Sequence, residues 1–324
     1  AKIVNTLTGE GYTPAEIKKH FTEFYYTTPE KADLAIETAR VQRPFLAPSA
    51  HRVVDFYVNI PFCPTRCLYC SFTSNSIVKY KKAVDPYLDS LEEELRAAAE
   101  MVRAMGADVE NLYLGGGTPT SLSETQFRRY MEMLARHLDL KNIREFSLEA
   151  GRPDSVTPDK LEAAKAAGVT RISINPQTMN DVTLKRIGRN HTAEQVEAAF
   201  YLAREKHFFN INMDIIAGLP YETEAMFQYT LEKIAQLAPE GMTVHTLSIK
   251  RGANLRDDRE SREALDTNLA GKMVAAAGIR AKEMGMHPFY MYRQKHMLGN
   301  HENISYCKPG FESPYNIHIM EEDR

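Results

Sequence analysis

Apolar and polar positions follow two patterns along this chain of 324 residues. Residues 1–50 are polar with a helical periodicity, and Thr13 followed by Pro14 is a typical helix start. From about residue 52, short apolar runs alternate with longer amphipathic stretches, which predicts strands alternating with helices. The strands are predicted at residues 53–60, 111–114, 144–149, 171–175, 208–216 and 242–249. The helices are predicted at residues 85–105, 123–138, 157–167, 192–206, 223–237 and 267–284.

Strand–helix units in succession predict a parallel sheet covered by helices, because parallel neighbours need a crossover connection. The expected fold class is α/β, a partial (β/α)6 barrel at residues 51–286. A helical extension at residues 1–50 precedes it, and a loop-rich tail at residues 287–324 follows. We expect this tail to be the start of a further C-terminal region. Parallel barrels place their chemistry at the carboxyl ends of the strands.

Composition narrows the class of protein. Hydrophobic residues make up 43% and charged residues 26%, which is typical of a soluble globular protein. The formal net charge is −3, so no positive field favours nucleic acid as a partner. No apolar run approaches the length of a membrane span. Few cysteines, three of them clustered, favour the cytoplasm.

Cys63, Cys67 and Cys70 form a C-x3-C-x2-C run just after the first predicted strand. Three clustered thiolates can hold three irons of a [4Fe–4S] cube and leave the fourth iron open to a small molecule. Structural zinc usually takes four ligands, and the sequence has no second cysteine pair. Disulfide frameworks are typical of short secreted chains, and this chain is long. The fourth cysteine, Cys307, is interpreted as a packed residue. The spacing favours a cluster, with zinc or inert cysteines as the alternatives.

The cysteine run resembles the signature of the radical S-adenosylmethionine (SAM) superfamily, C-x3-C-x-aromatic-C, with Tyr69 at the aromatic position. Residues 57–63, which read YVNIPFC, are similar to the oxygen-independent coproporphyrinogen III oxidase family. The resemblance implies that SAM binds the open iron and is cleaved by one electron to methionine and a 5′-deoxyadenosyl radical. Phe72 departs from the pattern, because the decarboxylating members of the family carry a further cysteine there.

A glycine run follows the second predicted strand. Gly115, Gly116 and Gly117 precede Thr118, and glycines allow the backbone to approach a ligand closely. A tight turn is the alternative for a bare glycine run. The resemblance implies that this backbone receives the amino group of SAM and that Tyr57 belongs to the same cofactor site.

Four polar residues at later strand ends match family positions for SAM. The resemblance implies that Glu149 meets the ammonium group or the ribose and that Gln177 contacts the ribose. It also implies that Arg189 faces the carboxylate of SAM and that Asp214 lies at the adenosine pocket. On the residues alone, Arg189 could be a surface cation and Asp214 a loop or helix-capping residue.

The tail is rich in tyrosine and cations, and its Tyr-Arg-Gln-Lys and Lys-Pro-Gly elements look like the HemZ-type branch of this family. A coproporphyrinogen needs aromatic walls and cations for its propionates. Arg293, Lys295 and Lys308 are therefore expected to lie over the barrel mouth and bind the substrate. The walls are expected from Tyr290, Tyr292, Tyr306 and Tyr315. A loop-rich structural cap is the alternative for the tail.

The function implied by the resemblance is oxidative decarboxylation of coproporphyrinogen III to protoporphyrinogen IX, in haem biosynthesis. It needs an electron donor such as flavodoxin or ferredoxin. One alternative is a non-enzymatic haem chaperone of the same family, although Tyr315-Asn316-Ile317-His318-Ile319 lacks the chaperone's His-Asn-x-x-Tyr motif. A radical SAM methyltransferase that acts on haem, or a radical SAM enzyme with an unrelated substrate, would also carry these motifs, because a fold does not determine its function.

Overall fold

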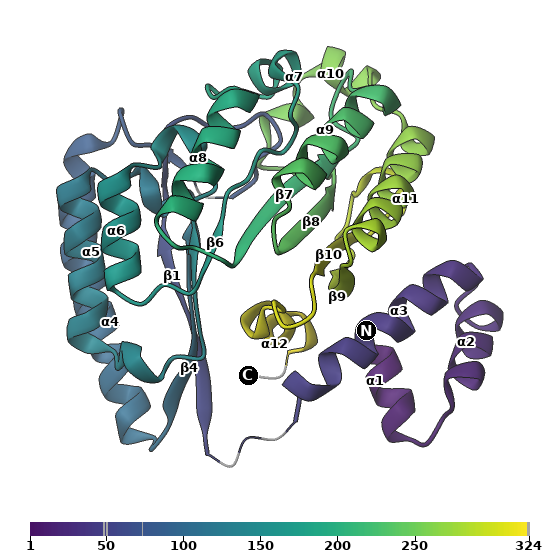
Figure 1. Ribbon diagram of the computed structural model, residues 1–324, viewed down its shortest axis with the longest axis horizontal. Helices are drawn as coiled ribbons and strands as arrows, with labels where there is room; N and C mark the ends of the chain where they lie inside the picture. Colours follow the sequence, from purple (N-terminus) through teal and green to yellow (C-terminus); the bar gives the residue numbers. More distant parts are fainter. Residues whose placement is uncertain (48, 50, 73, 323–324) are drawn as a thin grey trace.

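The computed structural model describes residues 1–47, 49, 51–72 and 74–322. A single curled sheet of eight strands forms its centre, and helices cover the outer face of the sheet (Figure 1). Six neighbouring strands run parallel. These are β1 Val53–Ile60, β4 Asp108–Gly116, β5 Glu145–Glu149, β6 Arg171–Ser173, β7 Ile211–Ala217 and β8 Gly241–Thr246. The predicted α/β partial barrel is confirmed, and the six strands agree with their predicted ranges within three residues.

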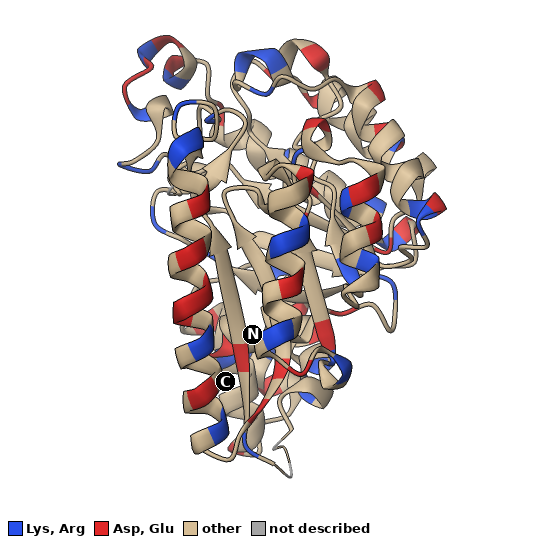
Figure 2. Cartoon of the chain, turned by 90° about the vertical axis from the view of Figure 1, so that its left-hand side faces the viewer, with Lys and Arg blue, Asp and Glu red and all other residues tan. Residues whose placement is uncertain are grey.

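Helices follow each of these strands and pack on the outside. They are α4 Val84–Ala104, α5 Glu124–His137, α6 Pro158–Ala166, α7 Asp181–Arg186, α8 Ala193–Glu205, α9 Glu224–Leu237, α10 Arg259–Glu263 and α11 Thr267–Glu283. Side chains of α4 such as Leu88 and Leu95 are buried against the sheet. Basic and acidic residues are interspersed along the outer helices, as Figure 2 shows for the face formed by the first of them.

The strands alternate between two buried faces. In β4, Leu112 and Leu114 belong to the hydrophobic core, whereas Tyr113 between them lines the interior of the barrel. In β7, Met213 lies in the same core and Asp214 lines the interior. Because side chains alternate along a strand, each strand delivers every second residue to the interior. The parallel register brings the carboxyl ends of the strands to one edge.

The tail contains more regular structure than the expected loops. It forms β9 His287–Tyr292, β10 Asn303–Cys307 and α12 Pro314–Glu321. β10 pairs antiparallel with β8, and β9 pairs antiparallel with β10, so that the sheet order is β1-β4-β5-β6-β7-β8-β10-β9. A second, small sheet pairs β2 Phe62–Cys63 with β3 Asn75–Ser76. The tail therefore widens the barrel wall by two strands.

The N-terminal extension is helical, as predicted, and covers the edge of the sheet. Its helices are α1 Lys2–Gly9, α2 Pro14–Glu23 and α3 Pro29–Gln42. Val4, Ile17 and Ala39 form a small buried cluster against which Met291 of the edge strand β9 packs. A covered edge strand is protected from pairing with another chain.

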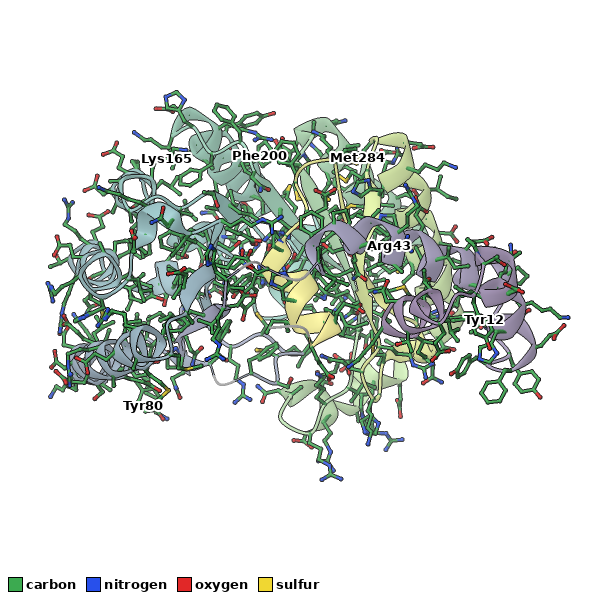
Figure 3. The ribbon with its side chains drawn as sticks, turned by 90° about the horizontal axis from the view of Figure 1, so that it is seen from below. Tyr12, Arg43, Tyr80, Lys165, Phe200 and Met284 are labelled. Carbon is green, nitrogen blue, oxygen red and sulfur yellow. The ribbon has the colours of Figure 1, made fainter. Side chains whose placement is uncertain are left out.

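Helix α12 lies across the lower end of the barrel, next to the N-terminal helices (Figure 3). His318 of α12 is fully buried. Its Nδ1 lies 2.6 Å from Asp55 Oδ2 on β1, and its Nε2 lies 3.1 Å from the carbonyl oxygen of Phe45. This helix is thus fixed both to the first strand of the barrel and to the N-terminal extension.

Among the described residues, no helix has the length and apolar character needed to cross a bilayer.

Candidate cofactor and substrate site

The three clustered cysteines line one cavity of about 370 Å³ inside the barrel. Cys63 ends β2, and Cys67 and Cys70 lie on the loop that follows. All three are free thiols; Cys67 is buried and the other two are half-buried. Burial raises the pKa of Cys63 to about 11, with a smaller opposing contribution from the Thr118 hydroxyl 3.4 Å from its sulfur. Metal binding drives such thiols to the thiolate form.

The cysteine loop is held at its beginning and in its middle. The backbone N–H of Ile77 donates to the carbonyl oxygen of Cys63 at 2.9 Å, which continues the small sheet. The N–H of Leu68 donates to the carbonyl oxygen of Ile187 at 2.9 Å, and the Thr65 hydroxyl donates to the carbonyl oxygen of Gly188 at 2.7 Å. The last two bonds tie the cysteine loop to the segment that follows α7.

The glycine run packs too closely against β1 to accept side chains. A Cβ on Gly116 would lie 1.8 Å from Asn59 Oδ1, and one on Gly117 would lie 2.5 Å from the carbonyl oxygen of Phe62. Gly116 also has a φ of +111°, which L residues rarely adopt. Gly116, Gly117 and Thr118 line the cavity, whereas Gly115 packs against Tyr57 beside it. The run brings bare backbone to the cavity wall.

Glu149 on β5 and Asp214 on β7 both line the cavity, and the pKa values of the two carboxyl groups are shifted in opposite directions. Burial raises the pKa of Glu149 to about 7, although its carboxylate accepts a hydrogen bond from the Tyr113 hydroxyl at 2.8 Å. Burial also opposes the charge of Asp214, but His245 and Asn212 outweigh it and hold its pKa below the ordinary value. The Asn212 amide donates to Asp214 at 2.6 Å, and His245 Nε2 lies 3.5 Å from the carboxylate.

Gln177 lies in the loop after β6 with a φ of +67° and is almost fully buried. Its N–H donates to the carbonyl oxygen of Asp214 at 2.9 Å, and its carbonyl oxygen accepts from Ile216 at 3.0 Å. Backbone bonds to the neighbouring strand thus hold Gln177 in a conformation that costs a non-glycine residue on the order of 1–3 kcal/mol.

Arg189 is buried where the loop after α7 meets the cysteine loop. Its Nη1 donates to the carbonyl oxygens of Asn175 at 2.6 Å and Gly151 at 3.2 Å. Its Nε is buried without a partner in the described part of the chain. Burial opposes its charge, but Tyr69 and Cys67 outweigh this effect and raise the pKa of Arg189. Its cationic end therefore lies beside a cysteine of the cluster motif.

These residues fit an iron–sulfur cluster with SAM. Three sulfurs converge on one cavity, which leaves an iron of a cube without a protein ligand. Next to them lie bare glycine backbone, two carboxylates, a glutamine and a buried arginine with an unpartnered nitrogen. An amino acid with an attached nucleoside needs this mixture of donors, acceptors and close backbone approach.

Three further predicted residues, Tyr57, Arg293 and Lys295, lie outside the cavity lining. Tyr57 is 51% exposed, and its ring stacks on that of Tyr113 at 5.9 Å. Arg293 and Lys295 are exposed in the loop after β9, on either side of Gln294, which does line the cavity. This loop lies at the carboxyl edge, since the Ser248 hydroxyl just beyond β8 donates to the carbonyl oxygen of Lys295 at 3.2 Å.

Lys308 is not where the sequence analysis put it. Its Nζ donates to the carbonyl oxygen of Ala238 at 3.1 Å and lies 3.7 Å from Glu240, just before β8 begins. It therefore lies at the opposite edge of the barrel from the cysteines, because β10 runs antiparallel to β8. Among the expected aromatic walls, Tyr290 and Tyr292 line the cavity, whereas Tyr306 packs in the hydrophobic core.

The lining also includes residues that were not anticipated, among them Tyr113, Arg152, Arg171 and His245. Tyr113 and His245 lie within strands, no more than three positions before the carboxyl end. Their sequence signal is period-two alternation, which places them on the same face as the residues that were predicted. Arg152 has a weaker signal, because it lies in the loop after β5 and not within a strand. Its Nη1 donates to the Thr65 hydroxyl of the cysteine loop at 3.0 Å.

Comparison with known proteins agrees with this arrangement. The radical SAM superfamily matches residues 57–234. The oxygen-independent coproporphyrinogen-III oxidase-like protein HemZ of Bacillus subtilis is 42% identical over 95% of this chain and 61% of its own length. The haem chaperone HemW of the same organism is 32% identical over 81% of this chain and 65% of its own length. The chain thus spans less than two thirds of the length of these relatives.

A solved structure has the same fold. The coproporphyrinogen III oxidase HemN from Escherichia coli, described as a radical SAM enzyme, superposes with a TM-score of 0.67 and 26% sequence identity. The superposition covers 85% of this chain and 59% of that structure. The likeness to the oxygen-independent coproporphyrinogen III oxidase family and its HemZ branch, predicted from the motifs, is confirmed by these relatives.

Proposed function

Because this chain belongs to the radical SAM superfamily, whose cofactors are a [4Fe–4S] cluster and SAM, we propose that it is an enzyme that decarboxylates coproporphyrinogen III oxidatively. Two propionate side chains become vinyl groups, which gives protoporphyrinogen IX. The observation that carries this proposal is the convergence of three cysteines and the predicted SAM residues on one cavity with tyrosine walls.

The residues have distinct proposed roles. Cys63, Cys67 and Cys70 would hold the cluster. The glycine run, Glu149, Gln177, Arg189 and Asp214 would hold SAM, with Tyr57 beside them at Gly115. When bound, these cofactors supply a radical that removes a hydrogen atom from a propionate β-carbon. Loss of CO2 and of one electron to an acceptor then leaves the vinyl group.

The cavity walls support chemistry of this kind. Tyr113, Tyr290 and Tyr292 present ring surfaces and are buried or half-buried. They would hold the macrocycle edge and keep water away from a reactive carbon. Arg293 and Lys295 would meet propionates at the mouth, where exposure limits each to less than about 1 kcal/mol. Arg293→Ala should raise the KM for porphyrinogen by a small factor and leave SAM cleavage without substrate unchanged.

The test is an anaerobic reaction with reconstituted cluster, SAM, a reductant and coproporphyrinogen III, followed by mass spectrometry. We expect products that have lost one and then two carboxyl groups as CO2. Formation of 5′-deoxyadenosine with unaltered porphyrinogen would contradict the proposed substrate. We also propose a cytoplasmic location and a flavodoxin or ferredoxin as the electron donor, which a reconstitution with either protein in place of a chemical reductant would test.

A haem chaperone is the second candidate, because HemW relatives match most of the chain. His318, near the position of the chaperone motif, is fully buried and bonded to Asp55 and Phe45, so it is poorly placed to ligate haem iron. Titration with haem separates the two functions. Tight binding without any porphyrinogen turnover would favour the chaperone.

A further inference from the structure

Arg171 lies deep in the cavity, at the beginning of β6. Ser173 lines the same cavity from the same face of β6, and Asn175 lines it from just beyond the strand. Two residues advance a strand by about 6.6 Å, so Arg171 lies well below the carboxyl edge where the cysteines are. Asn316 of α12, which lies across the lower end of the barrel, lines this inner part as well.

Three arginines line the cavity, and two of them have partners. Arg152 forms an ion pair with Asp154 at 3.1 Å, and Arg189 donates to backbone carbonyl oxygens. Arg171 is 3% exposed, yet it has no hydrogen bond or ion pair within the described part of the chain. A buried guanidinium without a partner is costly, so an anion in front of it would be bound favourably.

The nearest carboxylates do not fill this role. Glu149 and Asp214 feel the charge of Arg171 but lie beyond ion-pair distance. The Glu149 carboxylate already accepts from Tyr113 and from the N–H of Gly116. The Asp214 carboxylate is engaged by Asn212 and His245. Neither carboxylate pairs with Arg171, which leaves its guanidinium open to a bound molecule.

The surroundings indicate what kind of molecule this is. Tyr113 and Tyr290 line the cavity with Arg171, and both also feel its charge. Their rings bring apolar surface to the same cavity as this cation. A flat apolar body that carries a carboxylate on a short arm matches this combination. Arg189 lies beside Cys67 at the cysteine end, whereas Glu149 and Asp214 are close enough to Arg171 to feel its charge.

We propose that Arg171 is a substrate-binding residue that holds one carboxylate of the tetrapyrrole by its planar pair of N–H donors. This inference rests on the proposed function, since it names the group that selects the substrate at that same site. It takes a role that the sequence analysis expected of Lys308, which was placed over the barrel mouth. By fixing one propionate, Arg171 orients the macrocycle within the cavity.

The experiment measures binding rather than turnover. Coproporphyrin III, the oxidised and fluorescent porphyrin, and its tetramethyl ester are titrated anaerobically into reconstituted protein by fluorescence quenching. The variants are Arg171→Gln, Arg171→Lys and, as a matched control, Arg129→Gln on the outer face of α5, where the half-buried arginine pairs with Asp89. Cluster absorbance and SAM affinity are recorded for every sample.

We expect the unaltered protein to bind the acid at least about tenfold more tightly than the ester. Arg171→Gln should lose that preference, Arg171→Lys should keep part of it, and Arg129→Gln should keep all of it. SAM affinity and cluster content should not change. If Arg171→Gln fails to fold, Arg171→Lys decides the matter, because its charge remains while the paired donors are lost.

The outcomes separate the inference from the function. Tight binding of the acid with full preference in Arg171→Gln, or in a folded Arg171→Lys when the Gln variant is absent, overturns the inference and leaves the function standing. Loss of SAM affinity in Arg171→Gln assigns the arginine to the cofactor and also overturns it. No porphyrin binding and no turnover by the unaltered protein overturns the function and the inference together.

Discussion

At the scale of single residues, two buried carboxyl groups show how the same cause has different consequences. Burial raises the pKa of both Glu149 and Glu222 to about 7. Glu149 faces the cavity, where a cationic ligand can stabilise its ionised form. Glu222 accepts a hydrogen bond from the Thr178 hydroxyl at 2.5 Å, and its second oxygen is buried without a partner among the residues that the structure describes. One group is suited to binding, and the other reduces stability.

The pKa of Glu149 predicts how SAM binding depends on pH. Its carboxylate binds an ammonium group only when ionised, so affinity should rise on the order of tenfold between about pH 5.5 and about pH 7. Calorimetric titration of the reconstituted protein with SAM measures this slope. Glu149→Gln should bind more weakly and show a flatter profile. An equally steep profile in the variant would assign the titration to another group.

The pKa of Glu222 predicts how stability depends on pH. Its folded-state pKa of about 7 exceeds the ordinary value of 4.5, so the folded state binds the proton more tightly than the unfolded chain. Stability should therefore fall as the pH rises through this interval. Glu222→Gln should gain on the order of 3 kcal/mol near pH 8 and little near pH 5. Denaturant titrations at both values measure the difference, and a gain equal at both would refute the assignment.

At the scale of elements, the tail shows where reasoning from sequence stopped. The parallel strands were predictable because apolar runs alternate with amphipathic stretches. β9 and β10 were not, because each mixes polar, aromatic and apolar residues and pairs antiparallel with a parallel sheet. This reversal also explains the position of Lys308. A residue after β10 arrives at the amino edge of β8, whereas the tail was expected to end above the mouth.

Helix α12 should depend on its buried histidine. His318→Ala leaves the Asp55 carboxylate in β1, which is 3% exposed, without the imidazole that contacts it. A buried charge that loses a partner costs about 2–4 kcal/mol, so the melting temperature should fall and α12 should become sensitive to protease. Ile319→Ala, at a 47% exposed position on the same helix, should cost less than about 1 kcal/mol. Equal losses in the two variants would contradict this role.

At the scale of the whole molecule, the cluster site was the most predictable feature because it depends on local spacing. The position of Cys63, Cys67 and Cys70 could be predicted from the end of one strand alone. The deep part of the cavity was harder, since Arg171 opens a strand and its environment comes from β4, β9 and α12, which are distant in sequence. Spacing within a motif can be read from a sequence, but convergence of separate elements depends on the full set of strand pairings.

Iron content tests the cluster directly. Anaerobically reconstituted protein should hold about four irons per chain. Replacing any one of the three clustered cysteines by alanine should abolish or strongly reduce this content, because each holds one iron. Cys307→Ala is the matched control, since this cysteine is fully buried at the far end of β10 and lies outside the cavity lining. Tight binding of zinc, without the absorbance of an iron–sulfur cluster, would refute the predicted cluster.

The sheet has two ends, β1 and β9, that are not hydrogen-bonded to each other. The distance between them is therefore not fixed by strand pairing, in contrast to a closed barrel. Helix α12 contacts both β4 and β9 and so bridges this gap. One short helix, and not strand pairing, therefore spans the distance between the two ends of the sheet. In hydrogen exchange, amides of α12 should then lose protection before those of β4 to β8, because no strand pairing holds this helix, and the width of the gap depends on its position.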